Sequence, residues 1–203
     1  PGLIGAHTSV AVAGSTVWVA GYSEADWENG MTYGDLVVGK WNDKDKKVDW
    51  EFVDGVPADP PPDPKAYNVD GFRGGQTESG DDVGIWTSLA IDSAGNPAVA
   101  YYDRSNKVLK FAHHDGKAWT VSTVEGKANA DIGRYAKLLA QNGGFVLAYQ
   151  SVEAGGDNGA ALAKVRVATA ASDKVGAEAW TFEDAVVAKN TPCRANFCAA
   201  GTT

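Results

Sequence analysis

Between residues 83 and 126 the hydrophobic pattern consists of four short runs separated by residues that favour tight turns. The runs are rich in Val, Ile, Tyr, Phe and Trp and are too short for helices, which favours strands. The interruptions contain Gly, Asn, Pro and Asp, which tolerate positive φ, preset φ or bond their own backbone. The segment is therefore predicted to form a four-stranded antiparallel meander of about the size of one propeller blade. The runs are 86–91, 98–102, 108–113 and 119–124.

The same succession of runs recurs before and after this segment, which predicts an internal repeat with copies at about 2–54, 83–126 and 131–187. Three positions of the third strand align across the copies, as do a tyrosine that ends the second strand and a tryptophan that starts the fourth. We interpret the tryptophans as structural, because repeated blades repeat their packing. The aligned sets are Leu36, Leu109 and Val165; Val38, Phe111 and Val167; Gly39, Ala112 and Ala168; Tyr22, Tyr102 and Tyr149; and Trp50, Trp119 and Trp180.

The middle copy, with LAIDSAGNPAVAYYD followed by LKFAHHDGKAWTV, resembles the blade repeat of secreted bacterial β-propeller proteins. The resemblance covers almost the whole chain and implies an all-β fold, a β-propeller of four-stranded antiparallel blades. It implies little about function, since propellers of this kind serve as lectins, interaction modules and enzymes. The turn 114–119 is similar to the Asp-box turn of sialidases but lacks the full Ser-x-Asp-x-Gly-x-x-Trp pattern. We interpret it as a shared hairpin solution.

Three blades do not close a ring, because propellers use about four to eight, and a blade cannot bury both of its faces alone. We expect residues 1–203 to form one β-propeller domain or part of one. Further blades would come from missing sequence, from a second polypeptide or from a copy of this chain. Missing sequence is favoured, because residues 188–203 have the pattern of a lead-in to another blade.

The segment 55–82 interrupts the repeat and is rich in Pro and Gly, with six acidic residues against two basic ones. A long loop inside a compact domain is usually functional or disordered. Asp70, Asp81 and Asp82 are candidate ligands for Ca²⁺, which takes six to eight oxygen atoms. No EF-hand-like string is present, so a solvated acidic loop is the favoured interpretation, and no cofactor is expected to be required.

His7, Trp86 and Tyr135 align at the start of the innermost strand of the three copies, where they would surround the mouth of a propeller channel. Arg134 precedes Tyr135, and Trp27 lies in the long link 23–33 that reaches the same face. Aromatic rings with a few polar groups around a concavity suit the binding of sugars or peptides. The alternative is that these rings pack between neighbouring blades.

Two functions follow from this face. The first is a binding module for a glycan or protein ligand, with no catalytic residues. The alternative is a glycoside hydrolase of the sialidase-like propeller type, which needs several arginines, an acid and a nucleophile such as a tyrosine. Only five arginines are present, and Arg73 and Arg134 are the two that would face the channel mouth.

Charge and cysteine content indicate which partners and which cellular compartment to expect. The formal charge of −8 argues against nucleic acid as a partner, and no apolar run approaches the roughly 18 residues of a membrane span. Cys193 and Cys198 are the only cysteines and are predicted to form a local disulfide. A disulfide implies an oxidising compartment, so we expect an extracellular, periplasmic or cell-surface location.

Overall fold

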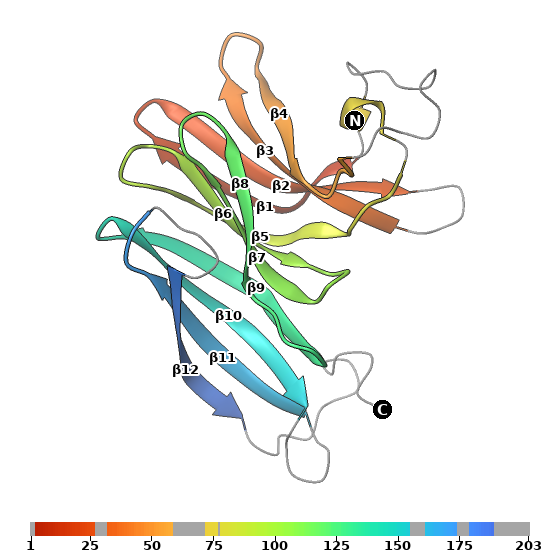
Figure 1. Cartoon of the computed structure of the whole chain (residues 1–203). Coiled ribbons are helices and arrows are strands. Elements are labelled where there is room, and N and C mark those ends of the chain that lie inside the picture. The colour runs from red at the N-terminus through yellow and green to blue at the C-terminus, as the bar shows by residue number, and fades with distance from the viewer. Residues whose placement is uncertain are drawn as a thin grey trace.

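The computed structural model describes residues 3–26, 32–58, 72–76, 78–154, 161–173 and 179–188. The described chain is all-β and consists of three four-stranded antiparallel sheets that follow one another like blades (Figure 1). In each sheet the spatial order of the strands is the order of the chain. The described part also contains the short 3-10 turn η1 (Phe72–Gly75).

The predicted meander is confirmed in all three sheets. The first contains β1 (Leu3–Ala13), β2 (Thr16–Asp26), β3 (Thr32–Asn42) and β4 (Lys47–Asp54). The second contains β5 (Val83–Ile91), β6 (Pro97–Asp103), β7 (Val108–His114) and β8 (Trp119–Glu125). The third contains β9 (Ala130–Gln141), β10 (Gly144–Ala154), β11 (Ala161–Ala170) and β12 (Trp180–Ala188).

The middle sheet is covered on both faces, which explains its nearly continuous apolar runs. Every residue of β6 is buried, including the consecutive Tyr101 and Tyr102, whose side chains point to opposite faces. One hydrophobic core lies between the first and second sheets, and a larger one lies between the second and third. Leu36, Val38, Val99 and Ala112 belong to the first core, and Phe111, Leu138, Phe145, Leu147 and Trp180 to the second.

Strand pairing confirms the alignment of the third strands, because the ladder with the fourth strand shifts register directly after Leu36, Leu109 and Val165. It corrects the alignment of the tyrosines. Leu36 pairs with Tyr22, and Leu109 pairs with Tyr102, but the equivalent Val165 pairs with Gln150. The alignment of Tyr149 with the other two tyrosines is therefore wrong by one residue. Because a shift of one residue reverses the face on which a side chain lies, Tyr149 corresponds instead to Tyr101.

The alignment of the tryptophans is wrong for one of the three. Trp119 pairs with the last residue of β7 and Trp180 with the last residue of β11, so these two are equivalent. The corresponding residue of the first sheet is Val48, which pairs with Trp41, and Trp50 lies two residues further along. The three rings also differ in burial, because Trp180 is buried whereas Trp50 and Trp119 are half-buried.

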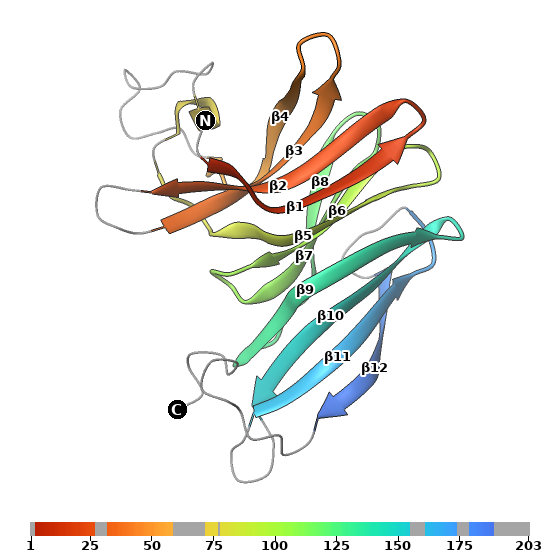
Figure 2. The ribbon, with the colours of Figure 1, turned by 180° about the vertical axis from the view of Figure 1, so that it is seen from behind.

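The outward faces of the first and third sheets expose apolar side chains, as the blade pattern predicts. Val10 and Val12 of β1 are 63% and 62% exposed, and Leu139 of β9 is 65% exposed. The described residues form three blade-like sheets and no closed ring (Figure 2). The source of any further blade stays a prediction. No helix within the described ranges is long and apolar enough to span a membrane.

Candidate functional site

Near its start, the first strand of each sheet carries a glycine that is followed two residues later by a ring-bearing residue. The three copies are Gly5-Ala6-His7, Gly84-Ile85-Trp86 and Gly133-Arg134-Tyr135. In each copy the ladder with the second strand is irregular around the ring-bearing residue. We call this end of the sheets, where β1, β5 and β9 begin, the loop end, and the opposite end the hairpin end (Figure 1).

Two of these glycines are required because the inner strand runs close to the third strand of the preceding sheet. A Cβ atom on Gly84 would lie 2.9 Å from the Cα of Leu36, and one on Gly133 would lie 2.8 Å from the Cα of Leu109. Both glycines also have positive φ, at 99° and 108°. Since Leu36 and Leu109 are equivalent positions, this close approach is a repeated feature of the fold.

His7, Trp86 and Tyr135 all adopt the left-handed backbone region, with φ of 55°, 54° and 56°. A positive φ is a genuine outlier for a bulky residue and costs on the order of 1–3 kcal/mol. Such strain clusters at binding and catalytic sites, where the surrounding structure holds it in place. The recurrence of this strained backbone at three equivalent positions indicates a functional site at the start of the inner strands.

The three rings lie beside one another and form a surface that we call the aromatic platform. The ring centroids of Trp86 and Tyr135 are 4.5 Å apart with planes at 42°, and those of Trp86 and His7 are 5.9 Å apart at 72°. Tyr135 is 55% exposed, His7 is exposed and Trp86 is half-buried. The platform therefore offers ring faces and edges to solvent instead of burying all of them between the sheets.

Buried tyrosines of the second strands support two of the platform rings. The ring of Tyr22 lies 6.0 Å from His7, and the ring of Tyr102 lies 5.3 Å from Trp86. The Tyr22 hydroxyl donates to Asp82 Oδ1 at 2.9 Å, and the Tyr102 hydroxyl donates to Asp131 Oδ1 at 2.8 Å. In both cases the carboxylate belongs to the next sheet, so each bond ties neighbouring sheets together below the platform.

A second pair of tyrosines donates hydrogen bonds to carboxylates of the preceding sheet. Tyr101 donates to Asp54 Oδ2 at 2.7 Å, and its equivalent Tyr149 donates to Glu125, so both reach the end of the preceding sheet's outer strand. Each of the two sheet interfaces thus carries one tyrosine–carboxylate bond in each direction. Buried bonds of this kind fix how the sheets are placed and hold the platform rings in register.

Both carboxylates below the platform are also paired with a guanidinium group. Arg104 Nη1 lies 3.0 Å from Asp82 Oδ2. Arg134 Nε donates to Asp131 Oδ1 at 3.0 Å, and its Nη2 contacts the other oxygen of the same carboxylate. The Arg134 guanidinium also lies 5.9 Å from the centroid of Trp86, a cation–π distance. Both of these guanidinium groups are therefore matched by acids of the chain itself.

The pKa shifts concern the two buried phenols and the ring of His7. Burial, with the hydrogen bond and the charge of the neighbouring Asp, raises the pKa of Tyr22 and of Tyr102 well above the usual value. Both phenols therefore stay protonated and act as donors. Desolvation by the surrounding groups, and then the charge of Arg104, lower the pKa of His7, so its ring is neutral at pH 7.

The structure brings together four of the residues predicted for ligand binding: His7, Trp86, Arg134 and Tyr135. The fifth, Trp27, lies outside the described residues, as do Asp70 and both cysteines of the predicted disulfide. The sequence interpretation missed the acceptor role of Asp131 and of Asp82. A signal was available, because Asp82 and Asp131 each precede the glycine motif by two residues in the pattern Asp-x-Gly-x-aromatic.

Asp81 and Asp82, the two predicted calcium ligands that lie within the described residues, both accept hydrogen bonds from other side chains of the protein. Asp82 accepts from Tyr22, and Asp81 Oδ2 accepts from Asn106 Nδ2 at 2.9 Å. Within the described ranges no group of three or more His, Cys, Asp or Glu residues is placed to hold a metal ion. Calcium binding stays an untested prediction.

Arg73, which was expected at the channel mouth, is instead buried against the first sheet. Its Nε and Nη2 donate to the two oxygens of Asp35 at 2.8 and 3.1 Å, and it also donates to the carbonyls of Glu78 and Ser79. Burial raises the pKa of Asp35 to about 6 although the charge of Arg73 acts against the rise. The pair anchors the end of the 55–82 segment to β3 and leaves no guanidinium of Arg73 for a ligand.

Comparison with known proteins identifies the fold only. No family model matches the chain, and no curated protein matches it. A crystal structure of a glycosyl hydrolase from Bacteroides ovatus is similar with a TM-score of 0.50 and 16% identity, over 90% of this chain and 50% of that one. A putative glycoside hydrolase from Bacteroides ovatus matches with a TM-score of 0.46 and 14% identity, over 83% and 46%. This chain spans about half the length of these structures.

Proposed function

We propose that the protein is a glycan-binding module whose contact surface is the aromatic platform of His7, Trp86 and Tyr135. The observation that carries the proposal is the repeated left-handed backbone that places three contacting rings at the surface. Exposed rings supply large apolar faces with a polar edge, which suits stacking against the apolar side of a sugar ring. The buried tyrosine–carboxylate bonds hold the rings in place before binding, and this lowers the entropic cost of association.

The charges at the loop end favour a neutral glycan over an acidic one. Arg104 and Arg134 already face Asp82 and Asp131, and Arg73 is buried against Asp35. A ligand carboxylate would have to compete with these acids for the guanidinium groups. The ligand that we propose is therefore an uncharged oligosaccharide that uses ring stacking and hydroxyl hydrogen bonds.

The same observations argue against the sialidase-like alternative. That chemistry needs free arginines for the substrate carboxylate and a tyrosine whose proton is readily removed. Here the described arginines of the loop end are paired, and the pKa of each buried tyrosine beside them is raised. The glycosyl hydrolase of similar fold supports a sugar as ligand only as an analogy, since fold does not determine function.

The proposal is tested with a panel of soluble neutral and sialylated oligosaccharides, measured by isothermal titration calorimetry. We expect at least one neutral oligosaccharide to bind, and Tyr135→Ala to weaken that binding about tenfold or more, as for the loss of a stacked ring. Trp41→Ala is the matched control, because Trp41 is an exposed ring of β3 at the hairpin end. Binding that is unchanged in Tyr135→Ala would refute the platform, and turnover of a fluorogenic glycoside would restore the enzymatic alternative.

A further inference from the structure

A concave site lies at the hairpin end, between the first and second sheets. Its volume is about 600 Å³, within the usual range for small-molecule sites. One wall is formed by the β1–β2 hairpin with Trp18 and Lys40, and the other by the β5–β6 and β7–β8 turns. Among the residues that line this cleft are Trp18, Lys40, Ile91, Asp92, Asn96 and His114.

Lys40 brings a positive charge to the rim of the cleft. Its Nζ lies 4.5 Å from the centroid of the Trp18 ring, a cation–π contact. The residue is exposed, and among the described residues no carboxylate oxygen lies within ion-pair distance of its Nζ. This ammonium group therefore differs from Arg104 and Arg134, whose charges are met by acids of the chain.

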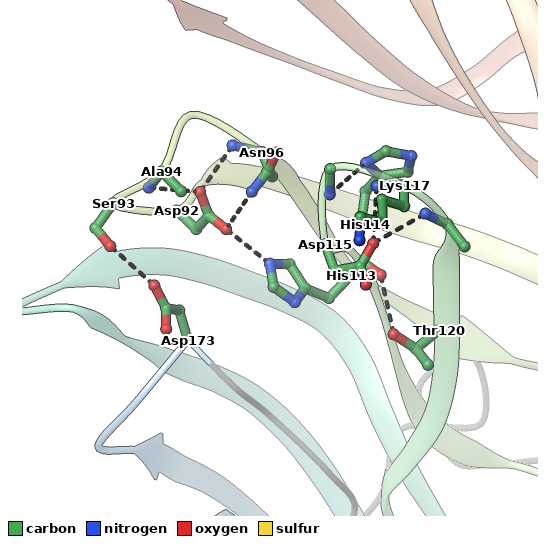
Figure 3. A network of polar contacts seen from close by, with 12 residues as sticks. Asp92, Ser93, Ala94, Asn96, His113, His114, Asp115, Lys117, Thr120 and Asp173 are labelled. Atoms are coloured by element: carbon green, nitrogen blue, oxygen red, sulfur yellow. Dashed lines mark hydrogen bonds and ion pairs between the residues drawn. The ribbon is translucent and has the colours of Figure 1, made fainter.

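His114 offers a hydrogen-bond donor to the same cleft. Its Nδ1 accepts a hydrogen bond from the backbone N–H of Gly116 at 3.0 Å, as Figure 3 shows. In the neutral imidazole this places the proton on Nε2, because one ring nitrogen accepts and the other donates. The ring also packs edge-on against Trp119 with centroids 5.2 Å apart, which restricts its orientation.

Asp92, the acid of the cleft lining, has its acceptor positions filled by the chain. Its Oδ1 accepts from the N–H groups of Ala94 and Asn96 at 2.9 and 2.7 Å. Its Oδ2 contacts Asn96 Nδ2 at 3.1 Å and His113 Nε2 at 2.9 Å (Figure 3). A carboxylate has about four acceptor positions, so Asp92 shapes the turn and has none left to offer a ligand or a metal ion.

From these contacts we infer that the cleft binds a sugar acid, with the ligand carboxylate between Lys40 Nζ and His114 Nε2. Charge-assisted hydrogen bonds to a carboxylate are stronger than neutral ones, and the carboxylate would replace the Trp18 ring as the partner of the ammonium group. The sugar ring would lie along Trp18 and Ile91, with Thr16 and Asn96 close to its hydroxyl groups. This site lies at the opposite end of the sheets from the platform and is independent of the proposed function.

The probe is trigalacturonic acid, and its methyl ester is the matched neutral ligand. We expect calorimetry to detect binding of the acid and at least a tenfold lower affinity for the ester, since the ester keeps the rings and loses the charge. Lys40→Gln should lower the affinity for the acid about tenfold. Lys44→Gln, which changes an exposed lysine in the β3–β4 turn of the same sheet, should leave it unchanged.

A second variant separates ligand recognition from folding of the turn. His114→Asn keeps an acceptor for the Gly116 N–H and removes the Nε2 donor, so it should weaken binding of the acid, while a cooperative thermal unfolding transition shows that the variant still folds. Equal binding of acid and ester, absence of binding, or an unchanged affinity in Lys40→Gln would each overturn the inference. Loss of acid binding in Tyr135→Ala but not in Lys40→Gln would place the acid on the platform and would overturn it as well.

Discussion

The two ends of the sheets use their polar groups in different ways. At the loop end buried hydrogen bonds cross from sheet to sheet, as Tyr22 to Asp82 and Tyr101 to Asp54 do. At the hairpin end the acids bond mainly within their own turns, as Asp92 and Asp115 do. The cross-sheet contacts there, Trp119 to Glu51 and Ser93 to Asp173, are exposed.

This difference explains why the loop end carries an exposed aromatic surface and the hairpin end carries a concave cleft. At the loop end the cross-sheet bonds fix the rings, and Arg104 and Arg134 are paired with acids of their own sheets, which leaves a rigid aromatic surface beside paired guanidinium groups. At the hairpin end the turn acids accept hydrogen bonds from their own turns. This leaves space between the sheets, and Lys40 has no acidic partner among the described residues. The loop end should therefore dominate stability, and the hairpin end should tolerate substitution.

The largest effect expected from this comparison is that of Arg73→Met. The substitution leaves Asp35 buried without its counter-charge, and breaking such a pair costs about 3–5 kcal/mol of unfolding free energy at pH 7. The penalty should shrink at pH 5, because a neutral Asp35 needs no counter-charge. Urea unfolding at both pH values measures it.

The wild-type protein gives the sign of the pH effect. The pKa of Asp35 in the folded state is about 6, above the ordinary value of 3.8 for an aspartate. The stabilisation linked to its protonation is therefore complete below about pH 4 and is lost as the pH rises through 6. A penalty for Arg73→Met that is equal at pH 5 and pH 7 would contradict the buried pair.

Removal of one hydroxyl group at each end should have a smaller effect on stability, and it compares the hydrogen bonds of the two ends directly. Tyr102→Phe takes a donor from the buried Asp131, and we expect a loss of about 1–3 kcal/mol. Ser93→Ala removes the exposed bond to Asp173 and should change stability by less than about 0.5 kcal/mol. Denaturant midpoints of the two variants compare the ends, and equal losses would show that the cross-sheet bonds carry no special weight.

The sequence was sufficient to predict the strands and the third-strand alignment, because these depend on local alternation and turn residues. It was insufficient for Tyr149, because only the pairing of β10 with β11 shows that Gln150, and not Tyr149, lies opposite Val165. The platform residues were predicted from their equivalent positions, but their left-handed backbone was not. The pairing of Arg73 with Asp35 spans 38 residues across a segment with no repeat, so no pattern in the chain indicated it.

Binding of a neutral glycan to the platform can be followed through the indole N–H signals of the tryptophans. Two-dimensional ¹H–¹⁵N NMR spectra of the protein, recorded during titration with the neutral oligosaccharide, follow the Nε1–H groups of Trp86 at the loop end and Trp18 at the hairpin end. Assignment comes from Trp86→Phe and Trp18→Phe. We expect the Trp86 signal to shift with the ligand concentration while the Trp18 signal stays in place. A shift of Trp18 alone, or of neither indole at saturation, would show that the glycan does not bind the platform.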